Sequence, residues 1–211
     1  VSDEQDMGAL AEHVSERAGV PDILVNNAGI GYFGLFLDTP TAAWRRVIEV
    51  NVMGVVNGIR AFLPAMRAAG GERWLVNVAS AAGFAPAPSM SAYAASKHAV
   101  IGLSEVLAME LEGSGVRVLM VCSGVINTPI VAGNAQMTPE FPQAQVQRLQ
   151  AYYMAKGCAP REVAEALLGA LGRGDIVVFA GPLARMSSVL MRISRRLARR
   201  VTLAKAREIG Y

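Results

Sequence analysis

Two side chains that could exchange protons, Tyr93 and Lys97, are four residues apart in a segment with a helical pattern. Residues at this spacing lie on one face of a helix, about one turn apart. A free phenol has a pKa of roughly 10, which is too high for efficient proton exchange at neutral pH. A nearby ammonium group favours the phenolate and lowers that pKa. The pair therefore has the chemistry of a general acid and base, although the same spacing is common on ordinary helix surfaces.

Two polar residues earlier in the chain could complete such a site. Ser80 follows a short apolar run, where its hydroxyl could hold a substrate oxygen. Asn51 lies inside a long helical pattern, in which asparagine is unfavourable and needs a reason. Taken alone, Ser80 could be a turn residue and Asn51 could cap or bend the helix. The four residues indicate a site because they occur together and in order.

Alternating strands and helices must position these residues. Short runs rich in Val, Ile and Leu predict buried parallel strands at residues 22–26, 74–78, 116–121 and 175–179. Helical patterns separate them at residues 3–18, 41–69, 91–112 and 161–171. This order predicts an α/β fold: a Rossmann-like, doubly wound parallel sheet in three α/β/α layers. Ligands bind such sheets at the carboxyl edge, where Ser80 is expected.

Residues 29–34 spell G-x-G-x-x-G, but we reject them as a dinucleotide fingerprint. That motif must open a helix at once, and here Pro40 is the expected start of the next helix. The chain also begins with a helix rather than a strand, so only one half of a doubly wound sheet is visible. We expect roughly 60 further residues upstream of Val1, about two strand–helix units.

Composition limits the remaining classes of function. The chain is 53% hydrophobic and 18% charged, which favours an oligomer or an apolar pocket. No run approaches the roughly 18 apolar residues that a membrane span needs, and we expect no signal peptide. Cys122 and Cys158 cannot form a disulfide framework, so we expect a cytoplasmic protein. Neither His13 nor His98 lies in a metal-ligand spacing, and we expect no metal.

Charge divides the chain into an acidic body and a basic tail. Residues 1–184 hold 12 Lys and Arg against 16 Asp and Glu, whereas residues 185–211 hold 8 against 1. The tail has a helical apolar stripe, so we expect a catalytic domain at 1–184 and a basic amphipathic helix at 185–211. That helix could lie on an anionic membrane surface, but packing against the body or a second subunit is the favoured interpretation. Nothing predicts nucleic-acid binding.

Five ordered segments resemble motifs of the short-chain dehydrogenase/reductase family. They are N-N-A-G at 26–29, N-x-x-G at 51–54, the serine segment at 77–83, Y-x-x-x-K at 93–97 and S-G-V-I-N-T at 123–128. The gap of 13 residues between Ser80 and Tyr93 is usual for the family. The resemblance extends to about residue 179.

The resemblance implies an oxidoreductase that transfers a hydride between NAD or NADP and an alcohol or ketone. Tyr93 would exchange the proton, and Lys97 would lower its pKa and bind the nicotinamide ribose. Ser80 would hold the substrate oxygen, and Asn51 would anchor a water that relays protons from Lys97. Besides Tyr93 and Lys97, the implied cofactor contacts are Val1, Asn27, Ala28, Gly29, Ile126 and Thr128.

Two departures from the family pattern are visible. The family's proline before Gly124 is Ser123 here, which predicts a looser turn. The family's N-terminal glycine motif, which holds the pyrophosphate, does not occur within the 211 residues.

The substrate and the assembly are predicted only by class. Residues 128–154 would cover the substrate, and their apolar content with Tyr152 and Tyr153 favours a hydrophobic alcohol or ketone. Helix packing is an equally good explanation of the two tyrosines. We expect a homo-oligomer. A non-catalytic binding or scaffold protein on the same fold is the alternative, which the four intact site residues disfavour.

Overall fold

The computed structural model of the chain describes residues 1–128, 130 and 136–209. Over these residues a parallel sheet of four strands forms the middle layer, in the order β1-β3-β4-β6. The strands are β1 (Ile23–Asn26), β3 (Arg73–Val78), β4 (Val116–Ser123) and β6 (Val177–Ala180). The four predicted strands are therefore present, with ends that differ by up to two residues. The turn after β1 runs into a two-residue strand and opens no helix, which confirms that residues 29–34 are not a dinucleotide fingerprint.

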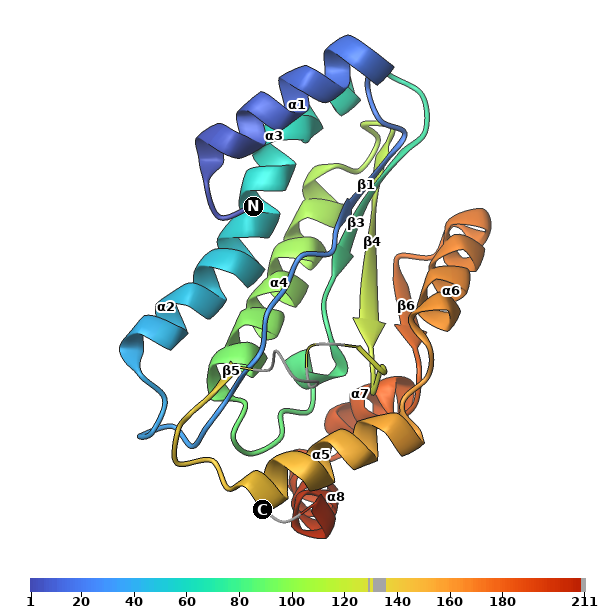
Figure 1. Cartoon of the computed structure of the whole chain (residues 1–211). Coiled ribbons are helices and arrows are strands. Elements are labelled where there is room, and N and C mark those ends of the chain that lie inside the picture. Colours follow the sequence, from blue (N-terminus) through green and yellow to red (C-terminus); the bar gives the residue numbers. More distant parts are fainter. Residues whose placement is uncertain (129, 131–135, 210–211) are drawn as a thin grey trace.

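Helices cover both faces of this sheet (Figure 1). One face carries α1 (Glu4–Ala18), α3 (Gly54–Ala68) and α4 (Ser91–Glu110), and the other carries α6 (Pro160–Arg173). Successive residues of each strand point to opposite faces of the sheet, so they pack against different helix layers. Leu75 and Val118 join the core beneath α3 and α4, whereas their neighbours Val76 and Leu119 join the core beneath α6. The three-layer α/β prediction is confirmed.

The predicted helix at 41–69 is one continuous helical stretch with a local defect. It comprises α2 (Thr41–Ile48), a π-helical turn (Glu49–Met53) and α3. By length and composition Thr41–Ala68 could cross a membrane, but half of its most apolar window is buried inside the protein. Its apolar residues are accounted for by packing against α1, α4 and the sheet.

Strand β1 lies at one edge of the sheet. Its side chains Ile23 and Val25 are 43% and 44% exposed, unlike those of the inner strands. The upstream strand–helix units expected from the sequence stay a prediction.

The segment after β4 contains structure that the sequence patterns did not predict. A two-residue strand β2 (Tyr32–Phe33) pairs with β5 (Gln136–Met137), and helix α5 (Gln143–Lys156) follows. Phe33 anchors this unit in a small core of its own with Phe141. Of the predicted covering segment at 128–154, Pro129 and residues 131–135 lie outside the described residues.

The prediction of one tail helix is wrong. The tail forms two helices, α7 (Ala184–Ile193) and α8 (Arg195–Ile209), which meet at Ser194. Ser194 is extended, with φ −157° and ψ 105°, and its hydroxyl accepts a hydrogen bond from the Leu197 N–H at 3.2 Å. A serine that caps the next helix competes with helix continuation, which explains the break.

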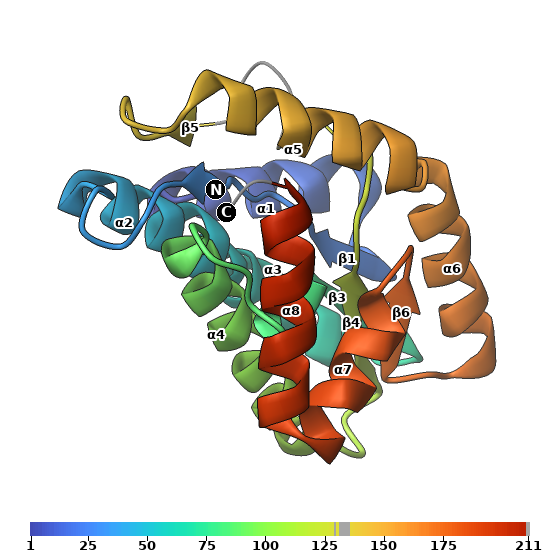
Figure 2. The same ribbon diagram turned by 90° about the horizontal axis from the view of Figure 1, so that it is seen from below.

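Helix α8 packs on the body of the protein. Figure 2, which views the molecule from below, shows α8 crossing the region toward which the strands point, close to α5 and α7. Ala198 and Ala206 are buried on its inner face, whereas Arg196, Arg199 and Arg200 are exposed. This arrangement fits the favoured interpretation of a packed helix with solvated arginines.

Candidate active site

Ser80 lies at the carboxyl edge of the sheet, directly after β3. It is buried, and its hydroxyl accepts from the Ala82 N–H at 3.2 Å and donates to the Ser123 carbonyl at 3.4 Å. The first bond caps a 3-10 turn (Ala81–Gly83), and the second ties the end of β3 to the end of β4. The hydroxyl is thus fixed where two parallel strands stop.

Gly83 allows this turn to press against α4. A Cβ at this position would lie 2.4 Å from the Ile101 Cδ1 and 3.0 Å from the Lys97 carbonyl oxygen. Real Cβ atoms do not tolerate such contacts, so a side chain here would push the turn away from the helix. The absence of a side chain at Gly83 therefore lets the serine segment at residues 77–83 pack closely on α4.

Tyr93 and Lys97 project from the first two turns of α4, and both are buried. The Lys97 Nζ donates to the Val78 carbonyl at 2.8 Å and lies 5.8 Å from the centre of the Tyr93 ring. The Ser80 side chain acts on the Tyr93 phenol as a hydrogen-bonding neighbour that lowers its pKa. The structure therefore brings Ser80, Tyr93 and Lys97 into one cluster at the carboxyl edge.

Asn51 is fully buried within the π-helical turn. Its Nδ2 donates to the Ser96 Oγ at 2.9 Å and to the Ile30 carbonyl at 2.9 Å, and its Oδ1 accepts from the Ile30 N–H at 2.8 Å. Ser96 in turn donates to the Tyr93 carbonyl at 2.7 Å. Asn51 thus joins the loop after β1 to the helix that carries Tyr93.

Ser96 was not singled out from the sequence. It is fully buried and links Asn51 to the Tyr93 main chain. The available signal was a serine between Tyr93 and Lys97, because serine is a weak helix former that needs a hydrogen-bond partner when buried.

Burial governs the pKa values of the central pair. It raises the pKa of Tyr93 above its usual value, although the hydrogen bond with Ser80 acts in the opposite direction. Burial also lowers the pKa of Lys97 to about 8, against a smaller upward influence of Cys122. The expectation of a lowered Tyr93 pKa is therefore wrong for the protein alone. It considered the lysine cation but not the cost of enclosing a phenolate in an apolar site.

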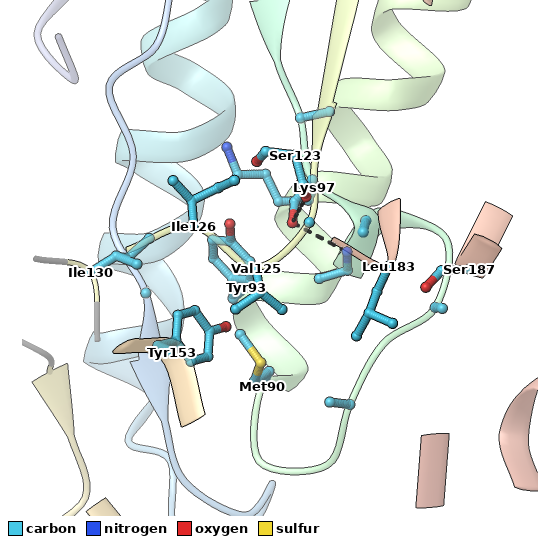
Figure 3. A pocket seen from close by; sticks show the side chains of 18 of the residues that line it. Met90, Tyr93, Lys97, Ser123, Val125, Ile126, Ile130, Tyr153, Leu183 and Ser187 are labelled. Atoms are coloured by element: carbon cyan, nitrogen blue, oxygen red, sulfur yellow. Dashed lines mark hydrogen bonds between the residues drawn. The ribbon is translucent and has the colours of Figure 1, made fainter. Parts of the chain in front are cut away.

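Most of the implied cofactor residues line the same hollow as the cluster. A cavity of about 700 Å³ is bordered by Tyr93 and Lys97 and by Asn27, Gly29, Ile126 and Thr128. Figure 3 shows Tyr93 and Lys97 on one side with Ile126 and Ser123 beside them, and Leu183 and Ser187 facing them from α7 and the loop before it. Ala28 is not among the residues that line this cavity.

Gly29 lies beside two polar groups of the cluster. A Cβ at Gly29 would lie 3.4 Å from the Asn51 Oδ1 and 3.5 Å from the Lys97 Nζ, so the bare backbone faces both polar groups. Val1 lies elsewhere, against α3: its carbonyl accepts from the Asn57 Nδ2 at 3.0 Å, and Gly54 packs on its side chain. Its implied contact with adenine stays a prediction.

No group of three or more metal-binding side chains occurs among the described residues. His98 is exposed, and its Nδ1 lies 3.0 Å from the Ala94 carbonyl of its own helix. The polar groups of the cluster itself are a hydroxyl, a phenol and an ammonium group.

Comparison with known proteins identifies the group to which this architecture belongs. Residues 1–139 match the family described as short chain dehydrogenase. The chain belongs to the short-chain dehydrogenase/reductase family. A short chain dehydrogenase/reductase from Burkholderia phymatum, solved in complex with NAD, superposes with a TM-score of 0.82 at 30% identity over 93% of this chain and 74% of that chain. One from Burkholderia cenocepacia J2315, solved in complex with NADP, gives a TM-score of 0.77 at 27% identity over 96% and 75%.

Sequence relatives share the family but are longer. "Probable oxidoreductase EphD" of Mycobacterium tuberculosis is 42% identical over 81% of this chain, which corresponds to 30% of that protein. D-beta-hydroxybutyrate dehydrogenase of Rhizobium meliloti is 42% identical over 56% of this chain and 45% of that protein. Trans-4-hydroxycyclohexanecarboxylate dehydrogenase of Sinomonas cyclohexanicum is 41% identical over 63% and 51%. The chain therefore spans between about a third and a half of these relatives.

Proposed function

We propose that the protein is an oxidoreductase that transfers a hydride between NAD or NADP and an alcohol or ketone. The observation that carries this proposal is the meeting of Ser80, Tyr93 and Lys97 on the wall of one largely apolar cavity. The bound nicotinamide would supply or accept the hydride. The described residues would position the substrate oxygen and move its proton.

In the proposed mechanism the Ser80 hydroxyl and the Tyr93 phenol hold the substrate oxygen. Tyr93 donates its proton to a ketone, or removes it from an alcohol, as the hydride moves. The Lys97 ammonium lies beside the Tyr93 ring and stabilises the phenolate that forms during ketone reduction. Asn51 holds the loop that carries Gly29, and would anchor the water that returns protons to Lys97.

Relatives support a hydroxyl group as the reacting centre. Two of them are named for hydroxybutyrate and hydroxycyclohexanecarboxylate, which are both hydroxy acids. The apolar cavity wall from α5 and α7, including Tyr153 and Leu190, supports a hydrophobic substrate body.

A non-catalytic scaffold is the competing proposal. Decay of an enzyme would relax the geometry of its buried polar groups, because an unsatisfied network costs stability without benefit. Here Ser80, Asn51, Ser96 and Lys97 all have hydrogen-bond partners. The retention of hydrogen-bond partners by all four residues favours a catalytic protein over a scaffold.

We also propose a cytoplasmic homo-oligomer. Both cysteines are free thiols, which fits a reducing compartment. Val106 and Met109 are 47% and 67% exposed on the outer face of α4, and a second copy would cover them.

Replacement of the Tyr93 hydroxyl tests the enzyme proposal. We expect Tyr93→Phe in the full-length protein to lower kcat for 4-hydroxycyclohexanecarboxylate or 3-hydroxybutyrate oxidation by about 100- to 10,000-fold. The cofactor affinity, measured by NADH or NADPH fluorescence, should change little. Tyr32→Phe makes the same change outside the cavity and should leave kcat unaltered. Full turnover by Tyr93→Phe would refute the mechanism.

A further inference from the structure

The described residues that line the active-site cavity include two charged side chains, and both are lysines. Lys97 lies at the catalytic end, and Lys205 of α8 lies on the wall formed by the tail. No aspartate or glutamate accompanies them among these lining residues. An apolar hollow with an excess of cations favours ligands that carry negative charge.

The two lysines differ in the partners that they already have within the protein. Lys97 is buried beside Tyr93 and donates to the Val78 carbonyl, so its role belongs to the catalytic cluster. Lys205 is half-exposed, and its Nζ reaches the Glu208 Oε2 at 2.9 Å, one turn along the same helix. A solvent-exposed pair at this spacing contributes little stability, so an incoming anion can compete with Glu208 for the ammonium.

Packing of α8 fixes Lys205 at the cavity. Ala198 and Ala206 are the buried contact points of this helix, and their small size lets it lie close to the body. Thr202 and Lys205 share that side of the helix, in keeping with its 3.6-residue period, and both line the cavity. The placement therefore follows from the docking of the whole helix.

A hollow that adjoins the cavity also carries more basic than acidic side chains. A shallow adjoining hollow shares Tyr152, Leu183 and Lys205 with the cavity, so the two spaces meet at Lys205. Its lining adds Lys156 to Lys205 and holds a single acidic residue, Glu208. The exposed arginines of α7 and α8 add positive charge to the same tail, which would favour the approach of anions.

We propose that Lys205 binds a carboxylate on the substrate, at the end remote from Tyr93. The substrate would thus be an apolar hydroxy acid or keto acid, whose body fills the cavity while its carboxylate replaces Glu208 as the partner of Lys205. This assignment rests on the proposed function for the identity of the reacting end. It gives the basic tail a role in substrate recognition.

Binding of an unreactive acid tests the assignment without any turnover. Octanoate and its neutral isostere octanamide are titrated into the full-length protein by calorimetry. We expect octanoate to bind more tightly than octanamide, and Lys205→Gln to weaken octanoate about 3- to 5-fold while leaving octanamide unchanged. Lys205→Arg should restore most of the octanoate affinity.

Matched variants on the same helix control for general charge effects. Arg207→Gln removes one positive charge from an exposed position outside the cavity lining, and it should weaken octanoate less than threefold. Glu208→Gln removes the competitor for Lys205 and should strengthen octanoate. Equal losses in Lys205→Gln and Arg207→Gln, or equal binding of the acid and the amide, would overturn the proposal.

Kinetics separate failure of this inference from failure of the proposed function. A series of hydroxy acids with increasing separation between hydroxyl and carboxylate is compared with the corresponding methyl esters. A wild-type preference for acids, expressed in KM and lost in Lys205→Gln, supports the carboxylate site. Equal turnover of acids and esters would refute the site and leave the oxidoreductase proposal intact. Loss of turnover by Tyr93→Phe in the same series tests the oxidoreductase proposal separately.

Discussion

The side chain of Asn51 makes two hydrogen bonds to a single residue, Ile30, one to its N–H at 2.8 Å and one to its carbonyl at 2.9 Å. This two-way contact fixes the loop after β1 from inside the π-helical turn. A Cβ at the neighbouring Gly29 would lie 3.5 Å from the Lys97 Nζ, so the loop is close to the cluster. In the proposed mechanism Asn51 would therefore position this loop as well as the water of the proton relay.

Loss of this contact should destabilise the protein and loosen the site. Asn51→Ala leaves the Ile30 N–H and carbonyl and the Ser96 hydroxyl without their partner, so we expect the free energy of unfolding to fall by about 2 to 4 kcal/mol. Urea denaturation measures this change. Asn51→Asp keeps the acceptor but loses the donor and buries a charge, so it should be at least as destabilising. Wild-type stability in Asn51→Ala would contradict the positioning role.

The buried lysine should make stability depend on pH in a defined direction. The folded-state pKa of Lys97 is about 8, below the usual 10.5, so the unfolded chain binds more protons between these values. Stability is therefore lowest below pH 8 and recovers as the pH rises toward 10.5. Relative to Lys97→Met, the wild-type free energy of unfolding should rise by about 2 kcal/mol from pH 7 to 9.5.

The comparison with Lys97→Met is needed because another buried group acts in the opposite direction. Burial raises the pKa of the Cys122 thiol to about 12, from a usual value of 9.0, so its ionisation in the unfolded chain lowers stability above pH 9. Both proteins retain Cys122, so most of this contribution cancels. If the free energy of unfolding of the two proteins varied with pH in parallel, the pKa of Lys97 would not be lowered in the folded protein.

The turn after β4 should not tolerate a side chain. A Cβ at Gly124 would lie 1.9 Å from the Pro182 carbonyl oxygen, and the atoms that it meets belong to the backbone. We expect Gly124→Ala to lower the free energy of unfolding by about 1 to 3 kcal/mol and to weaken cofactor binding by displacing the Ile126 loop. Gly8→Ala in α1 meets nothing within 4 Å and should stabilise the protein by about 0.5 to 1 kcal/mol. A lower melting temperature for Gly124→Ala and a higher one for Gly8→Ala would verify these two predictions. Equal changes in melting temperature would contradict them.

Self-association should depend on the outer face of α4. We expect light scattering to give a dimer or larger assembly for the wild type, and a smaller mass for Val106→Glu combined with Met109→Glu. Met154→Glu changes a side chain that is 72% exposed on α5 and should leave the mass unaltered. A monomeric wild type, or an unchanged mass in the double variant, would disprove the interface.

The hydrophobic periodicity of the sequence was sufficient to predict the sheet and the helix layers on both of its faces. Runs such as that of β4 are apolar at nearly every position because both faces are covered, and this property is local. The meeting of Ser80, Tyr93 and Lys97 was also predictable, because Tyr93 and Lys97 share one helix and Ser80 follows a strand. Each of these inferences needs only neighbouring residues and the rules of regular structure.

Other features depend on contacts that local patterns do not encode. The pKa of Tyr93 reflects how deeply the site is enclosed, and the π-helical turn at Asn51 depends on a loop 21 residues away. The pairing of β2 with β5 joins two-residue segments about a hundred residues apart, too short for any periodic signal.

The family motifs, the alternation of strands and helices and the basic charge of the tail follow from local patterns of residues. The course of α8 back across the carboxyl edge, where Lys205 lines the cavity, depends on contacts between distant parts of the chain. The reason is physical: an amphipathic helix specifies that one face will be buried but not which surface will bury it. The surface against which α8 packs is formed by α5 and α7.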